Sequence, residues 1–186
     1  MARLIYLTNV SLDGYIEDAG GGFDWTVPDD GLFAFITDLI RPVGTFLYGR
    51  RLYDAMAVWE TEPALAAQSE LMAEFARVWQ AADKVVYSTT SEAVTTARTR
   101  HERAFDRASV RALKESATHD LTVGGAQLAA HALRAGLVDE CQLLVHPVVV
   151  GGGKPALPSG VHLALELLDL RRFSNGVVYL RYRVQN

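Results

Sequence analysis

Cys141 is the single cysteine among the 186 residues of the sequence, so no internal disulfide can form. It lies in an apolar segment, where we expect a small core residue rather than a reactive thiol. One cysteine fits a reducing compartment, and we expect the protein in the cytoplasm. No apolar run approaches the ~20 residues that a membrane span needs, and no cleavage site follows the short apolar run at the N-terminus. We therefore expect neither a membrane span nor a signal peptide.

Several motifs of common enzymes are missing. No GxGxxG follows the first apolar run, where SLDG stands at residues 11–14. Residues 151–154 read GGGK, without the earlier glycine and the final Ser or Thr of a Walker loop. Neither HExxH nor GxSxG occurs, and the five histidines are scattered along the chain. The sequence therefore predicts no dedicated metal site, no Walker loop and no nucleophile elbow.

The sequence also lacks a strong charge of either sign. Lys and Arg number 18 and Asp and Glu 22, which gives a formal net charge of −4. Such a surface does not attract nucleic acid or anionic lipid, although a local basic patch for a small anion remains possible. Apolar residues make up 49% of the chain and charged residues 22%, as in globular proteins. We expect one domain over residues 1–186.

The early part of the sequence alternates between strand and helix patterns. Apolar runs that end in loop-forming residues predict strands at residues 3–10, 45–48, 84–88, 121–123 and 142–150, with a polar edge strand at 95–100. Helical apolar stripes lie between them, with Asp29 and Asp30 at one helix start and Pro63 suited to a first helical position. The late chain instead resembles a hairpin, since residues 167–173 and 177–184 flank Ser-Asn-Gly. The fold class is therefore α/β, a central mixed sheet, parallel at first, with antiparallel strands at its C-terminal edge.

Three expected strands run directly into glycine or polar residues. These segments are residues 49–51 (GRR), 88–90 (STT) and 124–127 (GGAQ). Ligands of open α/β sheets bind beyond the carboxyl ends of the strands, where glycine and helix N-termini favour phosphate. Read singly, each segment could equally be a plain turn, solvated charge or a loop. Together, on successive strand ends, they predict an extended ligand that carries several phosphates.

The sequence resembles the dihydrofolate-reductase-like superfamily, and within it the group related to the reductase domain of the riboflavin-biosynthesis deaminase-reductase. The resemblance spans nearly the whole chain. It rests on SLDGYI at 11–16, FDW at 23–25, LYGRRLYD at 47–54, VVYSTT at 85–90, LTVGGAQLAAHALRAGLVDE at 121–140 and LLVHPVVVGGGKPAL at 143–157. The stretch from VGGA to GGGKP is the most specific part. The resemblance implies a three-layer fold with helices on both faces of the sheet.

The resemblance also implies that NADPH binds across the strand ends. Arginine can form a bidentate contact with a 2′-phosphate, which favours NADPH over NADH. Ala126 replaces a third glycine of many dihydrofolate reductases, and the family holds the preceding glycine pair with a cis peptide bond. The residues that match cofactor-binding positions are Gly49, Arg50, Arg51, Ser88, Thr89, Gly124, Gly125, Ala126 and Gln127.

The catalytic position is open between two carboxylates. Dihydrofolate reductases use a carboxylate early in the first helix, and Asp30 lies in the matching region. The alternative is that Asp29 and Asp30 only cap that helix. Asp13 is the second candidate, although SLDG could be a simple tight turn. Tyr15, Phe23 and Trp25 could form an aromatic wall for a planar substrate, or belong to the core.

The expected function is NADPH-dependent hydride transfer to a small heterocycle of the pterin or pyrimidine type. One alternative is the riboflavin-pathway 5-amino-6-(5-phosphoribosylamino)uracil reductase, which needs a basic pocket for the substrate phosphate. Another is a non-catalytic NADP-binding module. The resemblance also suggests a homodimer. No deaminase zinc motif is present, so we do not expect the bifunctional enzyme.

Overall fold

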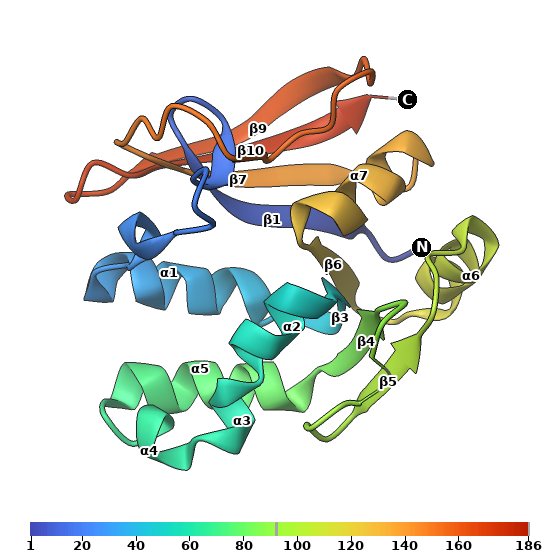
Figure 1. The fold of residues 1–186 in the computed structure, drawn as a ribbon, viewed down its shortest axis with the longest axis horizontal. Helices are drawn as coiled ribbons and strands as arrows, with labels where there is room; N and C mark the ends of the chain where they lie inside the picture. Colours follow the sequence, from blue (N-terminus) through green and yellow to red (C-terminus); the bar gives the residue numbers. More distant parts are fainter. Residues whose placement is uncertain (92, 186) are drawn as a thin grey trace.

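The computed structural model describes residues 1–91 and 93–185, which form an eight-stranded sheet with the strand order β5-β4-β3-β6-β1-β7-β10-β9 (Figure 1). The strands from β5 to β7 in that order run parallel, and β10 and β9 are antiparallel. The strands of this sheet are β1 (Leu4–Ser11), β3 (Val43–Gly49), β4 (Asp83–Tyr87), β5 (Thr99–Glu102), β6 (Asp120–Gly124), β7 (Glu140–His146), β9 (Ala164–Arg172) and β10 (Val178–Gln185). The predicted mixed α/β sheet is confirmed.

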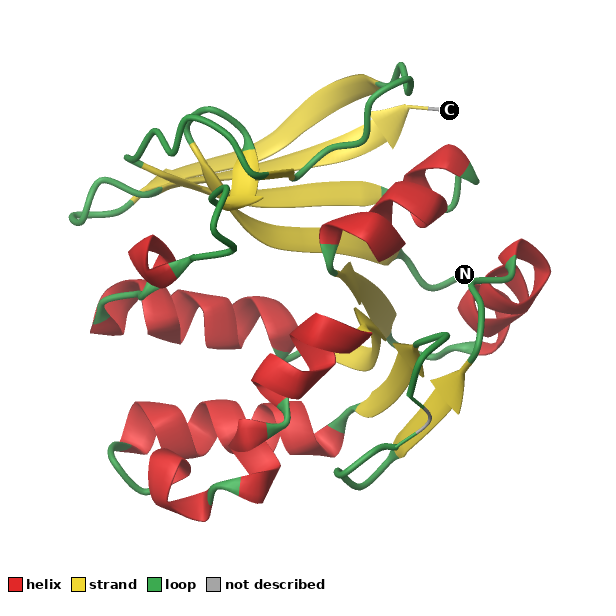
Figure 2. Ribbon diagram, in the orientation of Figure 1, coloured by secondary structure: helices red, strands yellow, loops and turns green. Residues whose placement is uncertain are grey.

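Helices cover both faces of the sheet (Figure 2). Alternation along β3 shows this, because Leu47 packs in the cluster beneath α6 and α7, whereas Phe46 and Tyr48 pack with α5. A third cluster joins α1 to β7 and β10. The helices are the 3-10 helix η1 (Asp24–Thr26), α1 (Asp30–Ile40), α2 (Arg50–Met56), α3 (Val58–Thr61), α4 (Pro63–Ala66), α5 (Glu70–Ala81), α6 (Arg107–Ser116) and α7 (Ala126–Arg134).

Local chemistry explains where the helices begin. The Asp29 carboxylate accepts a hydrogen bond from the Leu32 N–H and caps α1, and the Ser69 hydroxyl caps α5 in the same way. Pro63 is the first residue of α4, as predicted, and the apolar stripe beyond it belongs to the separate helix α5. Side chains such as Trp79 and Phe75 then bury the inner face of α5 against the sheet.

Two expected strands differ in their bounds. The strand expected at 142–150 is β7 and ends at His146, because Pro147 has no N–H to continue the ladder. The edge strand expected at 95–100 begins only at Thr99. The N–H groups of Thr95 and Thr96 are used elsewhere, since they donate to the Tyr53 hydroxyl at 2.7 and 3.1 Å.

A small second sheet lies at one end of the molecule. It pairs β2 (Tyr15–Glu17) with β8 (Lys154–Pro155) in antiparallel fashion. Gly153 allows the close approach, because a Cβ at that position would lie 2.0 Å from the Glu17 carbonyl oxygen. The chain after β1 is thereby held beside the chain after β7.

Candidate active site

The carboxyl ends of the parallel strands place two of the predicted glycine segments side by side. A Cβ on Gly125 would lie 3.7 Å from the Gly49 nitrogen, and a Cβ on Gly49 would lie 3.9 Å from the Gly124 carbonyl oxygen. The main chains at the ends of β3 and β6 therefore lie next to each other, with no side chain between them. A ligand that crosses this edge can approach both main chains closely.

The second glycine segment opens α7 without a side-chain cap. Gly125 is the N-cap residue and has a φ of +89°, which favours glycine. The N–H groups of the first turn, which begins at the buried Ala126 and exposed Gln127, are thus left for a ligand. Gly124 has a different constraint, since a Cβ there would lie 2.5 Å from Leu52 Cδ2. The described residues contain no cis peptide, so the Gly124–Gly125 bond is trans, unlike the bond that the resemblance implies.

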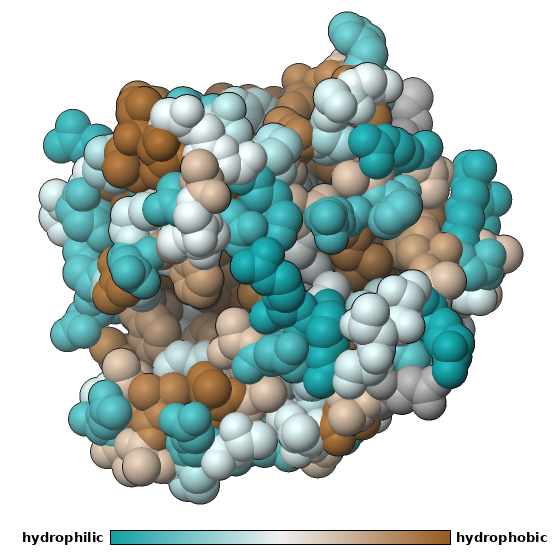
Figure 3. Space-filling model, viewed as in Figure 1, coloured by the Kyte–Doolittle hydropathy of each residue, from teal (hydrophilic) through white to brown (hydrophobic). Residues whose placement is uncertain are grey.

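The two predicted arginines point to different neighbours. Arg50 donates to the Ala93 carbonyl oxygen and to the Asp54 carboxylate, and its guanidinium lies 5.5 Å from the centre of the Tyr53 ring. Arg51 is 69% exposed and forms an ion pair with Glu17 at 3.2 Å. Arg50 therefore belongs to the side of the site near residues 88–93, and Arg51 to the side near β2. Figure 3 shows hydrophilic side chains over this part of the surface, around α2.

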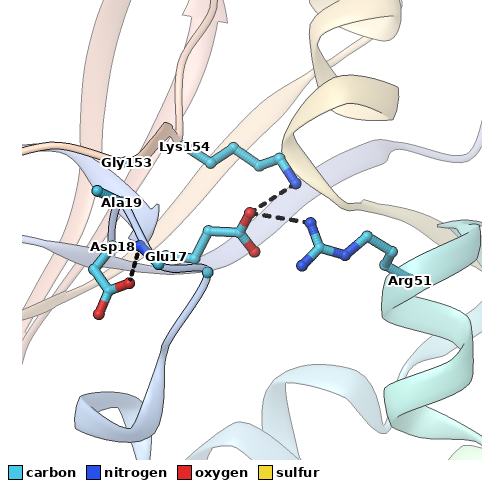
Figure 4. A pocket seen from close by; sticks show the side chains of 8 residues that line it. Glu17, Asp18, Ala19, Arg51, Gly153 and Lys154 are labelled. Carbon is cyan, nitrogen blue, oxygen red and sulfur yellow. Dashed lines mark hydrogen bonds and ion pairs between the residues drawn. The ribbon is translucent and has the colours of Figure 1, made fainter.

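An open pocket of about 590 Å³ lies between α2 and the small sheet. The Glu17 carboxylate joins the two cations of this pocket, because it forms ion pairs with Lys154 at 2.9 Å and with Arg51 at 3.2 Å (Figure 4). Asp18 faces its own loop and accepts from the Gly20 and Gly22 N–H groups. The sequence did not single out Glu17 or Lys154. Lys154 belonged to the rejected Walker pattern and to the LLVHPVVVGGGKPAL stretch of the resemblance, without a role of its own.

The third predicted segment is shaped by Ser88. Its hydroxyl accepts hydrogen bonds from the Thr90 and Ser91 N–H groups at 3.3 and 3.1 Å, and Ser88 is buried whereas Thr89 and Thr90 are exposed. His101 Nε2 lies 2.7 Å from the Ser88 carbonyl oxygen. Ser88 therefore fixes the loop after β4, and solvent reaches Thr89 and Thr90.

The two candidate catalytic carboxylates have different surroundings. Asp13 accepts from the N–H groups of Val150 and Gly151 at 3.1 and 2.8 Å, and hydrogen bonding, first with Ser11, lowers the pKa of its carboxyl. Asp29, not Asp30, caps α1. Asp30 is exposed and makes no hydrogen bond or ion pair with the part of the chain that the structure describes. Asp30 thus keeps a free carboxylate at the start of α1.

A polar pair that the sequence did not reveal lies at the ends of β1 and β7. His146 Nε2 and Asn9 Oδ1 are 2.9 Å apart, and His146 is only 3% exposed. Burial lowers the pKa of the His146 imidazole. The Trp25 ring meets the His146 ring edge to face, with centroids 5.5 Å apart. Of the three aromatics expected to form a wall, Trp25 contacts this pair, whereas Phe23 is half exposed.

Three further features of the described residues concern metal-ligating groups, long apolar helices and the cysteine. No group of three or more metal-ligating side chains occurs among residues 1–91 and 93–185. Within the same ranges, no helix has the length and apolarity to cross a bilayer. Cys141 is buried in the core, and burial raises the pKa of its thiol to about 11. Cys141 is therefore a core residue, as expected.

Comparison with known proteins assigns the chain to a family. A model of the RibD C-terminal domain matches residues 2–179. The chain belongs to the RibD C-terminal domain family. Its sequence is 32% identical over 188 residues to the uncharacterized protein YyaP of Bacillus subtilis, with 97% of this chain and 94% of YyaP covered. The resemblance read from the sequence is confirmed.

Solved structures share the fold of this RibD C-terminal domain. A Shewanella sp. PV-4 protein provisionally assigned to riboflavin biosynthesis has a TM-score of 0.75 at 20% identity and covers both chains fully. Acinetobacter baumannii RibD has a TM-score of 0.70 at 14% identity, with 100% of this chain and 58% of RibD covered. A Thermotoga maritima diaminohydroxyphosphoribosylaminopyrimidine deaminase/5-amino-6-(5-phosphoribosylamino)uracil reductase has a TM-score of 0.65 at 16% identity. The match covers 99% of this chain and 57% of the Thermotoga protein. The chain thus spans little more than half of these two proteins.

Proposed function

We propose that residues 1–186 form a single NADPH-dependent reductase domain that transfers hydride to a small heterocycle of the pterin or pyrimidine type. Membership of the RibD C-terminal domain family supports a reductase-type function. The observation that carries the cofactor assignment is the contact between Gly49 and Gly125 at the strand ends, beside the uncapped first turn of α7. These residues fit a dinucleotide, because bare backbone and free N–H groups suit its phosphates.

Each part of the strand edge has a role in this proposal. The α7 N-terminus, from Ala126 and Gln127, holds the pyrophosphate. Arg50 donates to the Ala93 carbonyl oxygen and follows Gly49, which pairs with Tyr87 just before Ser88, so Arg50 meets the adenosine 2′-phosphate. Arg51 lies on the β2 side and orients the part of the dinucleotide nearer the substrate. When bound, NADPH supplies the hydride, and the chain supplies orientation and a proton route.

Asp30 is the proton-donating residue in this proposal. Its carboxylate is exposed at the start of α1 and is not engaged by described residues. It can therefore protonate or polarise a substrate bound between α1 and the ends of β1 and β7. Asp13 instead holds the loops after β1 and β7 together, as its two backbone hydrogen bonds indicate.

A phosphorylated pyrimidine substrate, as in the riboflavin-pathway reductase, is the second candidate. The pocket with Lys154 and Arg51 favours it, since two cations line that pocket. Glu17 neutralises part of that charge, so a substrate phosphate must compete with its carboxylate for Lys154 and Arg51. Turnover of phosphorylated against unphosphorylated pyrimidines, in wild type and Lys154→Ala, separates the two candidates.

The homodimer suggested by the resemblance remains part of the proposal. Three leucines of the edge strand β9 are exposed: Leu165 at 40%, Leu167 at 51% and Leu170 at 58%. Their partners on β10 are Val184, Tyr182 and Leu180, which alternate along that strand and share one face. The register shift beside Arg181 keeps all three leucines on that face.

Calorimetric titration with NADPH and with NADH tests the reductase proposal. We expect NADPH to bind at least tenfold more tightly than NADH, and Arg50→Ala to abolish the difference. Arg77→Ala, on the exposed face of α5, is the matched control and keeps it. A panel of pterins, pyrimidines and flavins then tests turnover. No binding of either dinucleotide contradicts the proposal, and binding without turnover of any panel member supports a non-catalytic NADP-binding module.

A further inference from the structure

The Asn9–His146 pair lies where the proposed substrate would bind. β1 and β7 run parallel with Asn9 opposite Leu144 and Ser11 opposite His146, so Asn9 and His146 project from the same face of the sheet. Leu144 on that face packs with Leu32 of α1. The pair therefore lies on the face of the sheet that α1 covers, at the carboxyl ends of both strands. It is next to the 3-10 helix that carries Trp25.

The hydrogen bond of this pair fixes which polar atoms are left for a ligand. Asn9 Oδ1 can only accept, so His146 Nε2 carries the proton of the neutral ring. His146 Nδ1 then has an acceptor lone pair. The structure gives neither this atom nor the Asn9 Nδ2 group a hydrogen bond with residues 1–91 or 93–185. One acceptor, on His146, and one amide donor, on Asn9, therefore remain on these two hydrogen-bonded side chains.

Trp25 adds a second unused donor. Its indole Nε1–H is buried and has no hydrogen-bond partner among the described residues. A buried donor without an acceptor costs free energy, which an incoming acceptor would recover. The Trp25 ring packs edge to face on the His146 ring, with an interplanar angle of 72°, so the two aromatic groups belong to one small site. Two unused donors and one acceptor thus belong to one group of contacting side chains at the ends of β1 and β7.

We propose that Asn9, Trp25 and His146 recognise a lactam edge of the substrate, a ring carbonyl next to a ring N–H. The Asn9 amide and the Trp25 indole donate to the carbonyl oxygen, and His146 Nδ1 accepts from the ring N–H. All three are positioning residues. This inference rests on the proposed reductase function and narrows its substrate to pyrimidinone-like or pterin-like rings, because a ring without the lactam would leave these groups unpaired.

The test uses two ligands that differ only at the ring nitrogens, pteridine-2,4-dione and its 1,3-dimethyl derivative. Both keep the carbonyl groups, but the derivative has no ring N–H at these positions. We expect wild type to bind the dione at least tenfold more tightly in fluorescence or calorimetric titrations with NADPH present. His146→Phe, which keeps an aromatic ring against Trp25, should lower dione affinity about tenfold and leave the derivative unchanged, so that the preference disappears.

Trp25→Phe removes one donor to the carbonyl, so it should weaken both ligands about tenfold and preserve the preference. It also keeps the inference testable if His146→Phe does not fold. His162→Phe, at an exposed histidine outside the site, is the matched control and should change neither affinity. Equal binding of the two ligands to wild type, or unchanged dione affinity in Trp25→Phe, would overturn the inference.

Titration with NADPH alone separates this inference from the reductase proposal. We expect His146→Phe and Trp25→Phe to bind NADPH as wild type does, because Gly49, Arg50 and Gly125 are unaltered. Absence of dione binding in a protein that binds NADPH overturns only the lactam recognition. A dione preference in a protein that binds neither dinucleotide supports the recognition site and overturns the reductase proposal.

Discussion

The Asp13 carboxylate accepts a hydrogen bond from the Gly151 N–H, 2.8 Å away, and so joins the loop after β1 to the loop after β7. Asp13→Asn keeps one acceptor oxygen but loses the charge, and charge-assisted hydrogen bonds are about twice as strong as neutral ones. We expect KM for the substrate to rise several-fold while kcat changes little. Steady-state kinetics checks this. A fall in kcat of about 100-fold would instead mark Asp13 as the proton-donating residue.

Asp30→Asn, in contrast, should change kcat rather than KM. Removing the proton-donating carboxylate should lower kcat by about 100-fold or more, because general acid catalysis contributes about 10²–10⁴-fold. The neighbouring Asp29→Asn is the matched control, since asparagine also caps helices well and turnover should persist. NADPH affinity should remain unchanged in both variants. Undiminished turnover in Asp30→Asn would show that another group delivers the proton.

Gly151 and Gly153, in the loop before β8, allow the cost of backbone strain to be measured separately from the cost of a close contact. Gly153 has a φ of +137° and would place a Cβ 2.0 Å from the Glu17 carbonyl oxygen, whereas Gly151 has a φ of +76° and open space around it. Gly151→Ala should lower the free energy of unfolding by about 1–2 kcal/mol from strain alone. Gly153→Ala should cost about 3 kcal/mol or more, since it must also separate β2 from β8. Urea unfolding measures both, and equal costs would contradict the close contact.

His146 should make stability depend on pH. Burial lowers its pKa in the folded protein, whereas in the unfolded chain it takes its ordinary value of about 6.5. Below about pH 6.5 the unfolded state binds the proton more readily, so the free energy of unfolding falls as pH decreases. The fall approaches at most about 1.4 kcal/mol per pH unit. The free energy of unfolding, measured from pH 5 to 8, should depend less steeply on pH in His146→Gln than in wild type. Identical slopes would contradict this role of His146.

The leucines of β9 should control assembly. Leu167→Asp places a charge in the middle of the exposed apolar face and should raise the dimer dissociation constant at least 100-fold. Leu157→Asp, at an exposed leucine of the loop before β9, is the control and should leave assembly unchanged. Light scattering across a concentration series measures both. A wild type that remains monomeric at high concentration contradicts the homodimer.

The sequence predicted elements and fold class well, because apolar alternation and glycine breaks are local signals. The strand order was beyond it, since no local pattern shows that β1 lies between β6 and β7. In the site, the segments at Gly49 and Gly125 could be predicted because each lies at the end of its own strand. The Asn9–His146 pair could not, because the two residues are 137 positions apart and no spacing in the sequence links Asn9 to the LLVHPVVVGGGKPAL stretch that contains His146.

The central place of β1 has a consequence for synthesis. Its two neighbours in the sheet are β6 and β7, and Leu4 is tied to residues as distant as Asp139, 135 positions later. During synthesis β1 therefore has no hydrogen-bonding partner in this sheet until β6, more than 100 residues later, has been made. Such non-local pairing slows folding and leaves an apolar segment unpaired in the meantime. A chain that stops before β6 leaves this apolar segment without either of its neighbouring strands.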